Sequence, residues 1–182
     1  RDDFGVGRRA AEILLRHGKK RIALITPSAR NRGMSLRVAG FRDCLESAGF
    51  PSEHFFMFEG NSKDFAGGHL AVTSLLASGA RPDAIYLVND LMTAGALDCL
   101  SRSGISVPDD VELLSYGNTD APSLVPSVTS FDPRAGELAC ACIESLFAEI
   151  RRETAPGRYF CFPARCLWRD SCPRTPQDEQ FD

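Results

Sequence analysis

The chain has 182 residues and a formal net charge of −3, with 43% hydrophobic and 25% charged residues. This composition is that of a globular protein with an apolar core, and no apolar run is long enough to span a membrane. The small acidic excess argues against the chain itself being an electrostatic nucleic-acid binder, because such proteins carry a basic excess on one face.

The chain contains seven cysteines, which are spread through predicted helices and strands. An odd number in a chain of this size fits a reduced, cytoplasmic protein better than a disulfide framework. Cys140 and Cys142 would lie on different faces of a helix, and none of the three histidines is close in sequence to a cysteine pair. We therefore expect no metal site and no cofactor. The first residues lack the apolar segment of a signal peptide, so we expect neither secretion nor a complete protein.

Helical and strand patterns alternate along the first two thirds of the chain. Each predicted helix ends at a glycine, which is favoured where a helix terminates. The strands are apolar on both faces, as in a parallel sheet that helices cover on each side. The predicted order is helix 7–17, strand 22–25, helix 35–48, strand 55–58, helix 64–78, strand 84–88, helix 91–103 and strand 111–114. Such βαβ units predict an α/β fold: a parallel sheet with helices on both faces.

The pattern changes after Ser115. Residues 116–126 form a loop rich in Gly, Asn, Asp, Pro and Ser, and 128–131 form a short strand. Pro133 then begins a helix that runs to about residue 152. One face of this helix is apolar, and we expect it to point inward; it carries Leu138, Cys142, Leu146 and Ile150. Residues 173–182 are predicted to be a flexible tail.

Two small polar residues, Asn89 and Asp90, stand between the predicted strand 84–88 and the helix 91–103. Open α/β sheets bind ligands at the carboxyl ends of their strands, where loops converge and helix N-termini offer free N–H groups. Asn89 can both donate and accept, which suits a sugar hydroxyl or a purine edge. We expect Asn89 to bind a small molecule and Asp90 to cap the helix.

Arg37 is the second candidate from position alone, since it lies near the start of a helix that follows a strand. Its guanidinium can form a forked pair of hydrogen bonds with a carboxylate or with adjacent hydroxyls. The alternative is a surface arginine in a salt bridge. On the first interpretation, Arg37→Ala weakens ligand binding and leaves folding intact.

Six short segments follow one another in the order of the motifs of one family. They are 18–25 (GKKRIALI), 37–41 (RVAGF), 82–95 (PDAIYLVNDLMTAG), 104–111 (GISVPDDV), 129–136 (TSFDPRAG) and 169–171 (RDS). Together they resemble the effector-binding core of the lactose/galactose-repressor (LacI/GalR) family of bacterial transcription regulators.

The resemblance implies a periplasmic-binding-protein-like effector domain over 1–172. One subdomain would be complete, and 1–18 and about 129–154 would be elements of the other. A small, sugar-like effector would bind between the subdomains. DNA would be bound only through a helix-turn-helix headpiece outside this chain, in a homodimer.

The resemblance also implies particular effector contacts. Arg37 and Asn89 match contact positions, and Asp132 matches a position in the cleft between the subdomains. Where the family has an aspartate pair, this chain has Gly117 and Asn118. Either Asn118 or Asp120 takes over that role, or the effector lacks the group that an aspartate holds. Phe65 is the candidate for an aromatic side chain that stacks on ligand in some relatives.

Two other classes of function were considered. An enzyme is disfavoured because no G-x-G-x-x-G motif opens a helix and there is no P-loop or nucleophile elbow, so we expect no catalytic residues. A periplasmic-type sugar-binding protein of a transport system would share the two-lobed design. The cysteine usage and the missing export signal argue against it.

Overall fold

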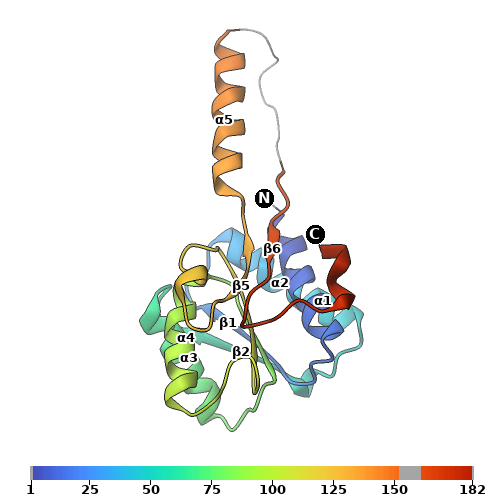
Figure 1. The fold of residues 1–182 in the computed structure, drawn as a ribbon, viewed down its shortest axis with the longest axis vertical. Helices are drawn as coiled ribbons and strands as arrows, with labels where there is room; N and C mark the ends of the chain where they lie inside the picture. Colours follow the sequence, from blue (N-terminus) through green and yellow to red (C-terminus); the bar gives the residue numbers. More distant parts are fainter. Residues whose placement is uncertain (1, 152–160, 182) are drawn as a thin grey trace.

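The computed structural model describes residues 2–151 and 161–181 and contains one six-stranded sheet (Figure 1). The strand order is β2-β1-β3-β4-β5-β6, and the first five strands run parallel while β6 is antiparallel to β5. The strands are β1 (Ile22–Pro27), β2 (Phe55–Gly60), β3 (Ala84–Leu87), β4 (Glu112–Tyr116), β5 (Thr129–Asp132) and β6 (Arg165–Leu167). The predicted parallel α/β sheet is confirmed.

Helices cover both faces of this sheet, as predicted. The α-helices are α1 (Asp3–Arg16), α2 (Arg32–Ser47), α3 (Phe65–Ala77), α4 (Thr93–Arg102) and α5 (Ala135–Ile150), and the 3-10 helices are η1 (Ser52–His54), η2 (Asp90–Met92), η3 (Ala121–Ser123) and η4 (Pro176–Phe181). Helices α1 and α2 bury one face, and α3 and α4 bury the other. Successive strand residues alternate between the two cores: Leu24 and Tyr86 face α1 and α2, whereas Ile25 and Leu87 face α3 and α4.

Helix α1 is part of the domain formed by the sheet and the helices on its two faces. We predicted residues 1–18 to be an element of a second subdomain, but α1 packs on the sheet beside α2. It ends at Arg16 with His17 as the C-cap residue, and Gly18 follows with a φ of 71°, the left-handed conformation that glycine adopts most easily. This turn places His17 and Lys19 next to the start of β4, at the amino edge of the sheet.

Helix α5 projects away from the body (Figure 1). None of its residues is buried, so the predicted inward-facing side chains are instead partly or largely exposed. Its most exposed large apolar side chains, at 52–66%, are Ile143, Leu146, Phe147 and Ile150. The prediction of a buried face was wrong for the described structure because no other described element covers this face; residues 152–154 lie outside the described ranges. Within those ranges, no helix combines the length and apolarity needed to cross a membrane.

The predicted flexible tail, 173–182, also differs from the structure. Residues Pro176–Phe181 form η4. Asp178 is fully buried, accepts a hydrogen bond from the Thr175 backbone N–H at 2.7 Å and pairs with His17 of α1. A buried carboxylate with several partners holds this segment against α1.

Tyr86 lies in the middle of the sheet, and substitutions of its side chain test how the core is packed. Its ring stacks on Phe41, with the centroids 5.1 Å apart, and its hydroxyl has no hydrogen-bond partner among the described residues. Burial raises the pKa of this hydroxyl, which therefore stays protonated. We expect Tyr86→Phe to leave the free energy of unfolding unchanged or raise it by up to about 1 kcal/mol, because an unsatisfied buried group is removed.

Urea denaturation followed by circular dichroism measures this difference. Phe41→Ala, which removes the ring that stacks on Tyr86, should lower the free energy of unfolding by roughly 3–5 kcal/mol. A loss above about 1.5 kcal/mol in Tyr86→Phe would mean that the hydroxyl is hydrogen-bonded after all.

Candidate ligand-binding site at the carboxyl edge of the sheet

The carboxyl ends of the parallel strands meet at one edge of the sheet, and the four predicted site residues lie along it. Asn89 follows β3, Asn118 follows β4 and Asp132 is the last residue of β5. Arg37 reaches the same edge from α2, the helix that follows β1, because its side chain bonds to the end of β3. The fold therefore gathers residues from four separate segments at the position where open α/β sheets bind ligands.

Arg37 is almost fully buried, with 5% of its surface exposed. Its Nε donates to the Val88 carbonyl at 3.1 Å, and its Nη1 forms an ion pair with Asp3 of α1. Its guanidinium carbon lies 3.7 Å from the centroid of the Tyr116 ring, a cation–π contact. Arg37 is therefore not the surface salt bridge of the alternative interpretation. It ties α1, β3 and β4 together at the edge where a ligand would bind.

The roles of Asn89 and Asp90 differ from the prediction. Asn89 is the N-cap of η2: its Oδ1 accepts from the Leu91 N–H at 3.3 Å, and its Nδ2 donates to the Lys63 carbonyl at 2.9 Å. Asp90, the expected cap, accepts instead from the Thr119 N–H at 2.5 Å. Asn89 thus joins the β3 end to the loop before α3, and Asp90 joins it to the loop after β4.

Asn118 and Asp132 belong to one hydrogen-bonded group. The Nδ2 of Asn118 donates to Asp132 Oδ2 at 3.4 Å, and its Oδ1 accepts from Arg169 Nη2 at 2.6 Å. Asn118 has a φ of 63°, a left-handed conformation that asparagine tolerates better than most residues. Of the two residues proposed to replace the family's aspartate, Asn118 contacts Asp132, whereas Asp120 is exposed at the start of η3.

Arg169 was not among the predicted site residues. Its Nη1 also donates to the Val128 carbonyl at 2.6 Å, so its guanidinium bridges the start of β5 and Asn118. In the sequence, residues 169–171 served only as one of the segments that resemble the family, and that resemblance assigned Arg169 no contact with the effector.

Phe65 is the exposed aromatic side chain of this edge. It is the first residue of α3 and is 49% exposed, and its ring stacks on His69 with centroids 6.3 Å apart. Asp64 caps the helix by accepting from the Gly67 N–H. Amides, a carboxylate, guanidinium groups and one exposed ring make an edge suited to binding a polyhydroxylated or heterocyclic molecule through hydrogen bonds and stacking.

Comparison with known proteins agrees with this architecture. Residues 11–172 match the family described as periplasmic binding protein-like domain. The ribose operon repressor of Haemophilus influenzae is 25% identical over 163 residues, which cover 89% of this chain and 49% of the repressor. The Escherichia coli ribose operon repressor is 29% identical over 80% of this chain and 44% of its own length. The PurR repressor of Histophilus somni is 26% identical over 82% of this chain and 45% of its own length. The chain spans less than half of each.

Solved structures show the same likeness. A LacI family regulator from Enterococcus faecium with bound ribose superposes with a TM-score of 0.84 at 25% identity, covering 94% of this chain and 63% of that one. A LacI family regulator from Burkholderia phymatum gives a TM-score of 0.83 at 28% identity, covering 95% of this chain and 62% of that one. The chain belongs to the periplasmic-binding-protein-like domain family and is an effector-domain core of the LacI/GalR type.

Proposed function

We propose that this chain is the ligand-sensing part of a bacterial LacI-type transcriptional regulator. A small sugar-like effector binds at the carboxyl edge of the sheet and changes the affinity of the full-length protein for DNA. The observation that carries the proposal is the convergence of Arg37, Asn89, Asn118 and Asp132 on that edge. The relatives named ribose operon repressor, and the ribose-bound neighbour, support this class of effector.

The exposed apolar face of α5 supports a second wall for the effector site. Helix α5 projects from the rest of the domain with Ile143, Leu146 and Phe147 exposed. Exposed apolar side chains on one helix face call for another surface to cover them. We propose that α5 packs on a second lobe in the full-length protein and that the effector binds between the lobes. Binding would then favour one relative orientation of the lobes, which is a population shift.

The proposal includes a cytoplasmic homodimer that contacts DNA through a helix-turn-helix outside this chain. In such a dimer, a change in lobe orientation alters the spacing of the two DNA-binding units, which sets the match to the two operator half-sites. Catalysis is not part of the proposed function.

Asp132→Asn tests the site by removing a charge at nearly constant shape. Isothermal titration of the full-length gene product with ribose, hexoses, their phosphates and purine bases should identify a ligand. We expect Asp132→Asn to weaken its binding about 10-fold or more, because a hydrogen bond to a charged group contributes roughly 1.5–3 kcal/mol.

Asp110→Asn is the matched control. Asp110 accepts from the Ser106 N–H at 2.8 Å, just as Asp132 accepts from the Arg134 N–H at 2.8 Å, but it precedes β4 at the opposite edge of the sheet. This variant should bind the ligand like the unmodified protein. Equal affinity in both variants would contradict the site, and a ligand that leaves DNA affinity unchanged would contradict the regulatory role.

A further inference from the structure

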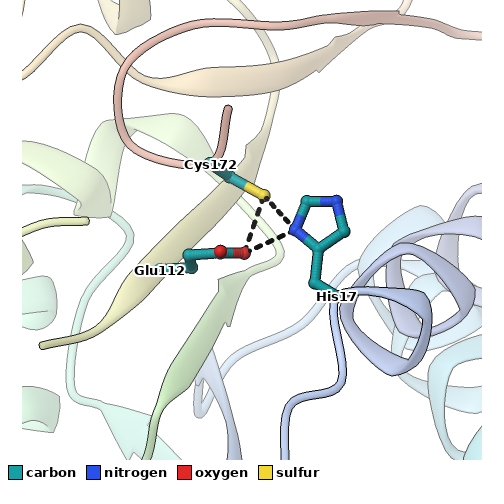
Figure 2. Close-up of side chains that lie close together, drawn as sticks. All are labelled: His17, Glu112 and Cys172. Atoms are coloured by element: carbon teal, nitrogen blue, oxygen red, sulfur yellow. Dashed lines mark hydrogen bonds and ion pairs between the residues drawn. The ribbon is translucent and has the colours of Figure 1, made fainter. Parts of the chain in front are cut away.

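Three potential metal ligands converge at the amino edge of the sheet, opposite the effector residues. His17 is the C-cap residue of α1, Glu112 begins β4 and Cys172 follows β6 (Figure 2). His17 Nδ1 lies 2.7 Å from Glu112 Oε2 and 3.7 Å from Cys172 Sγ, and the sulfur lies 3.3 Å from the same carboxylate oxygen. The described residues contain no other group of three histidine, cysteine or acidic side chains placed to hold a metal ion.

The surroundings of the three residues resemble those of a metal site. His17 Nε2 hydrogen-bonds Asp178 Oδ2 at 2.9 Å. Histidines that bind a metal commonly donate their other ring N–H to a carboxylate, which fixes the ring and raises the basicity of the ligating nitrogen. The other oxygen of Glu112 pairs with Lys19 Nζ at 2.9 Å, so the carboxylate is held as well.

The cluster is buried and rich in acidic groups. The side chains of His17 and Asp178 are 2% and 0% exposed, and Cys172 is 0% exposed. Burial and the neighbouring Glu112 raise the pKa of the Cys172 thiol, so without a cation it stays protonated. A bound cation reverses this preference, because it stabilises the thiolate directly.

We propose that His17, Glu112 and Cys172 form a zinc site that fastens the C-terminal segment to α1 and β4. Bonds of about 2.0–2.3 Å at a tetrahedral ion place the nitrogen, oxygen and sulfur ligand atoms roughly 3.3–3.6 Å apart. The two distances to Cys172 Sγ, 3.7 and 3.3 Å, are already close to this spacing. Only Glu112 Oε2 and His17 Nδ1, at 2.7 Å, must move apart for a zinc ion to lie between the three ligand atoms.

The donor set favours zinc over the hard cations. Calcium and magnesium prefer oxygen ligands, whereas thiolate, imidazole and carboxylate together suit Zn²⁺. Zinc binds the thiolate of Cys172 and an unprotonated Nδ1 of His17, so the Cys172 thiol proton passes to solvent on binding, and Nε2 keeps its hydrogen bond to Asp178.

Our expectation of no metal site rested on how far apart the cysteines and histidines lie along the sequence. His17 lies 95 residues from Glu112 and 155 from Cys172, so no paired motif exists to find. The site depends on the fold alone, and it is independent of the effector proposal because the two sites occupy opposite edges of the sheet.

Metal binding by the full-length gene product tests the site. The protein is stripped with a chelator and titrated with ZnCl₂ against a chromophoric competitor, and separately with Co²⁺. We expect one equivalent of zinc, a zinc-dependent rise in Tm, and a near-ultraviolet thiolate-to-cobalt charge-transfer band. Ligand binding to the folded state raises Tm by mass action.

Variants assign the ligands. Cys172→Ser and His17→Gln should abolish the zinc-dependent rise in Tm, and Cys172→Ser should also remove the cobalt band. Asp178→Asn removes no zinc ligand but replaces the carboxylate that His17 Nε2 and Thr175 share, and it should weaken zinc binding by ~10–100-fold. The control is Cys44→Ser, since Cys44 is also buried and free but is not part of the cluster; it should bind zinc normally.

Two results would overturn the proposal. The first is an unmodified protein that binds no zinc at micromolar concentrations or binds cobalt without the thiolate band. The second is a Cys172→Ser variant that binds zinc as tightly as the unmodified protein. The cobalt spectrum of the unmodified protein decides the question even if a variant does not fold.

Discussion

Gly40→Ala is expected to destabilise the domain by roughly 3 kcal/mol, at the upper end of the cost of overpacking a core. A Cβ at Gly40 of α2 would lie 2.0 Å from the carbonyl oxygen of Phe4 in α1. The reverse contact is equally close, since a Cβ at Gly7 would lie 2.1 Å from the carbonyl oxygen of Arg37. Because backbone atoms are hit in both cases, only a movement of α1 away from α2 relieves the clash.

Urea denaturation measures the effect, and Gly136→Ala is the control. Gly136 lies in α5, where an added Cβ would meet nothing within 4 Å. Alanine there should leave the free energy of unfolding unchanged or raise it by up to about 1 kcal/mol. If Gly40→Ala cost less than about 1 kcal/mol, the two helices would not pack at the observed spacing.

The sequence patterns predicted the helices and strands well but could not predict this contact. Apolar strands such as 22–25 and helices that end at glycines are local signals, and each was found within a few residues of its observed bounds. The close approach of Gly7 and Gly40 joins positions on two helices, and no local pattern reports it. The apolar stripe of α5 predicted burial, yet what would cover it is not among the described residues.

The place of the candidate residues in the fold was predicted better than their hydrogen-bond partners. Asn89 and Asp132 lie at the carboxyl edge of the sheet, as their positions after predicted strands indicated, because the carboxyl ends of parallel strands share one edge. Asp90 was predicted to cap the helix, but Asn89 is the N-cap of η2. Both residue types cap well, and the choice depends on the Lys63 and Thr119 backbone groups nearby. Asp3 was missed because it lies 34 residues from the arginine that it pairs with.

Arg37→Ala is expected to lower the free energy of unfolding by ~3–5 kcal/mol, the usual cost of breaking a buried ion pair. The substitution leaves Asp3 without its partner, removes the donor to the Val88 carbonyl and uncovers the Tyr116 ring. This corrects the expectation that folding would be unaffected. Arg42→Ala is the control, because Arg42 lies on the same helix but is exposed, and its loss should change stability by less than about 0.5 kcal/mol.

A second variant separates the structural role of Arg37 from ligand contact. Asp3→Ala combined with Arg37→Met removes both charges and keeps much of the side-chain volume over Tyr116. Replacing a buried ion pair by apolar groups is often nearly neutral, so the double variant should be more stable than Arg37→Ala. Calorimetric titration below the Tm of each variant then measures effector affinity in folded protein. Because the apolar methionine offers no hydrogen-bond donor, a folded double variant with normal effector affinity would show that Arg37 supports the edge without touching the ligand. Lost affinity in a folded double variant would assign the guanidinium to the ligand as well.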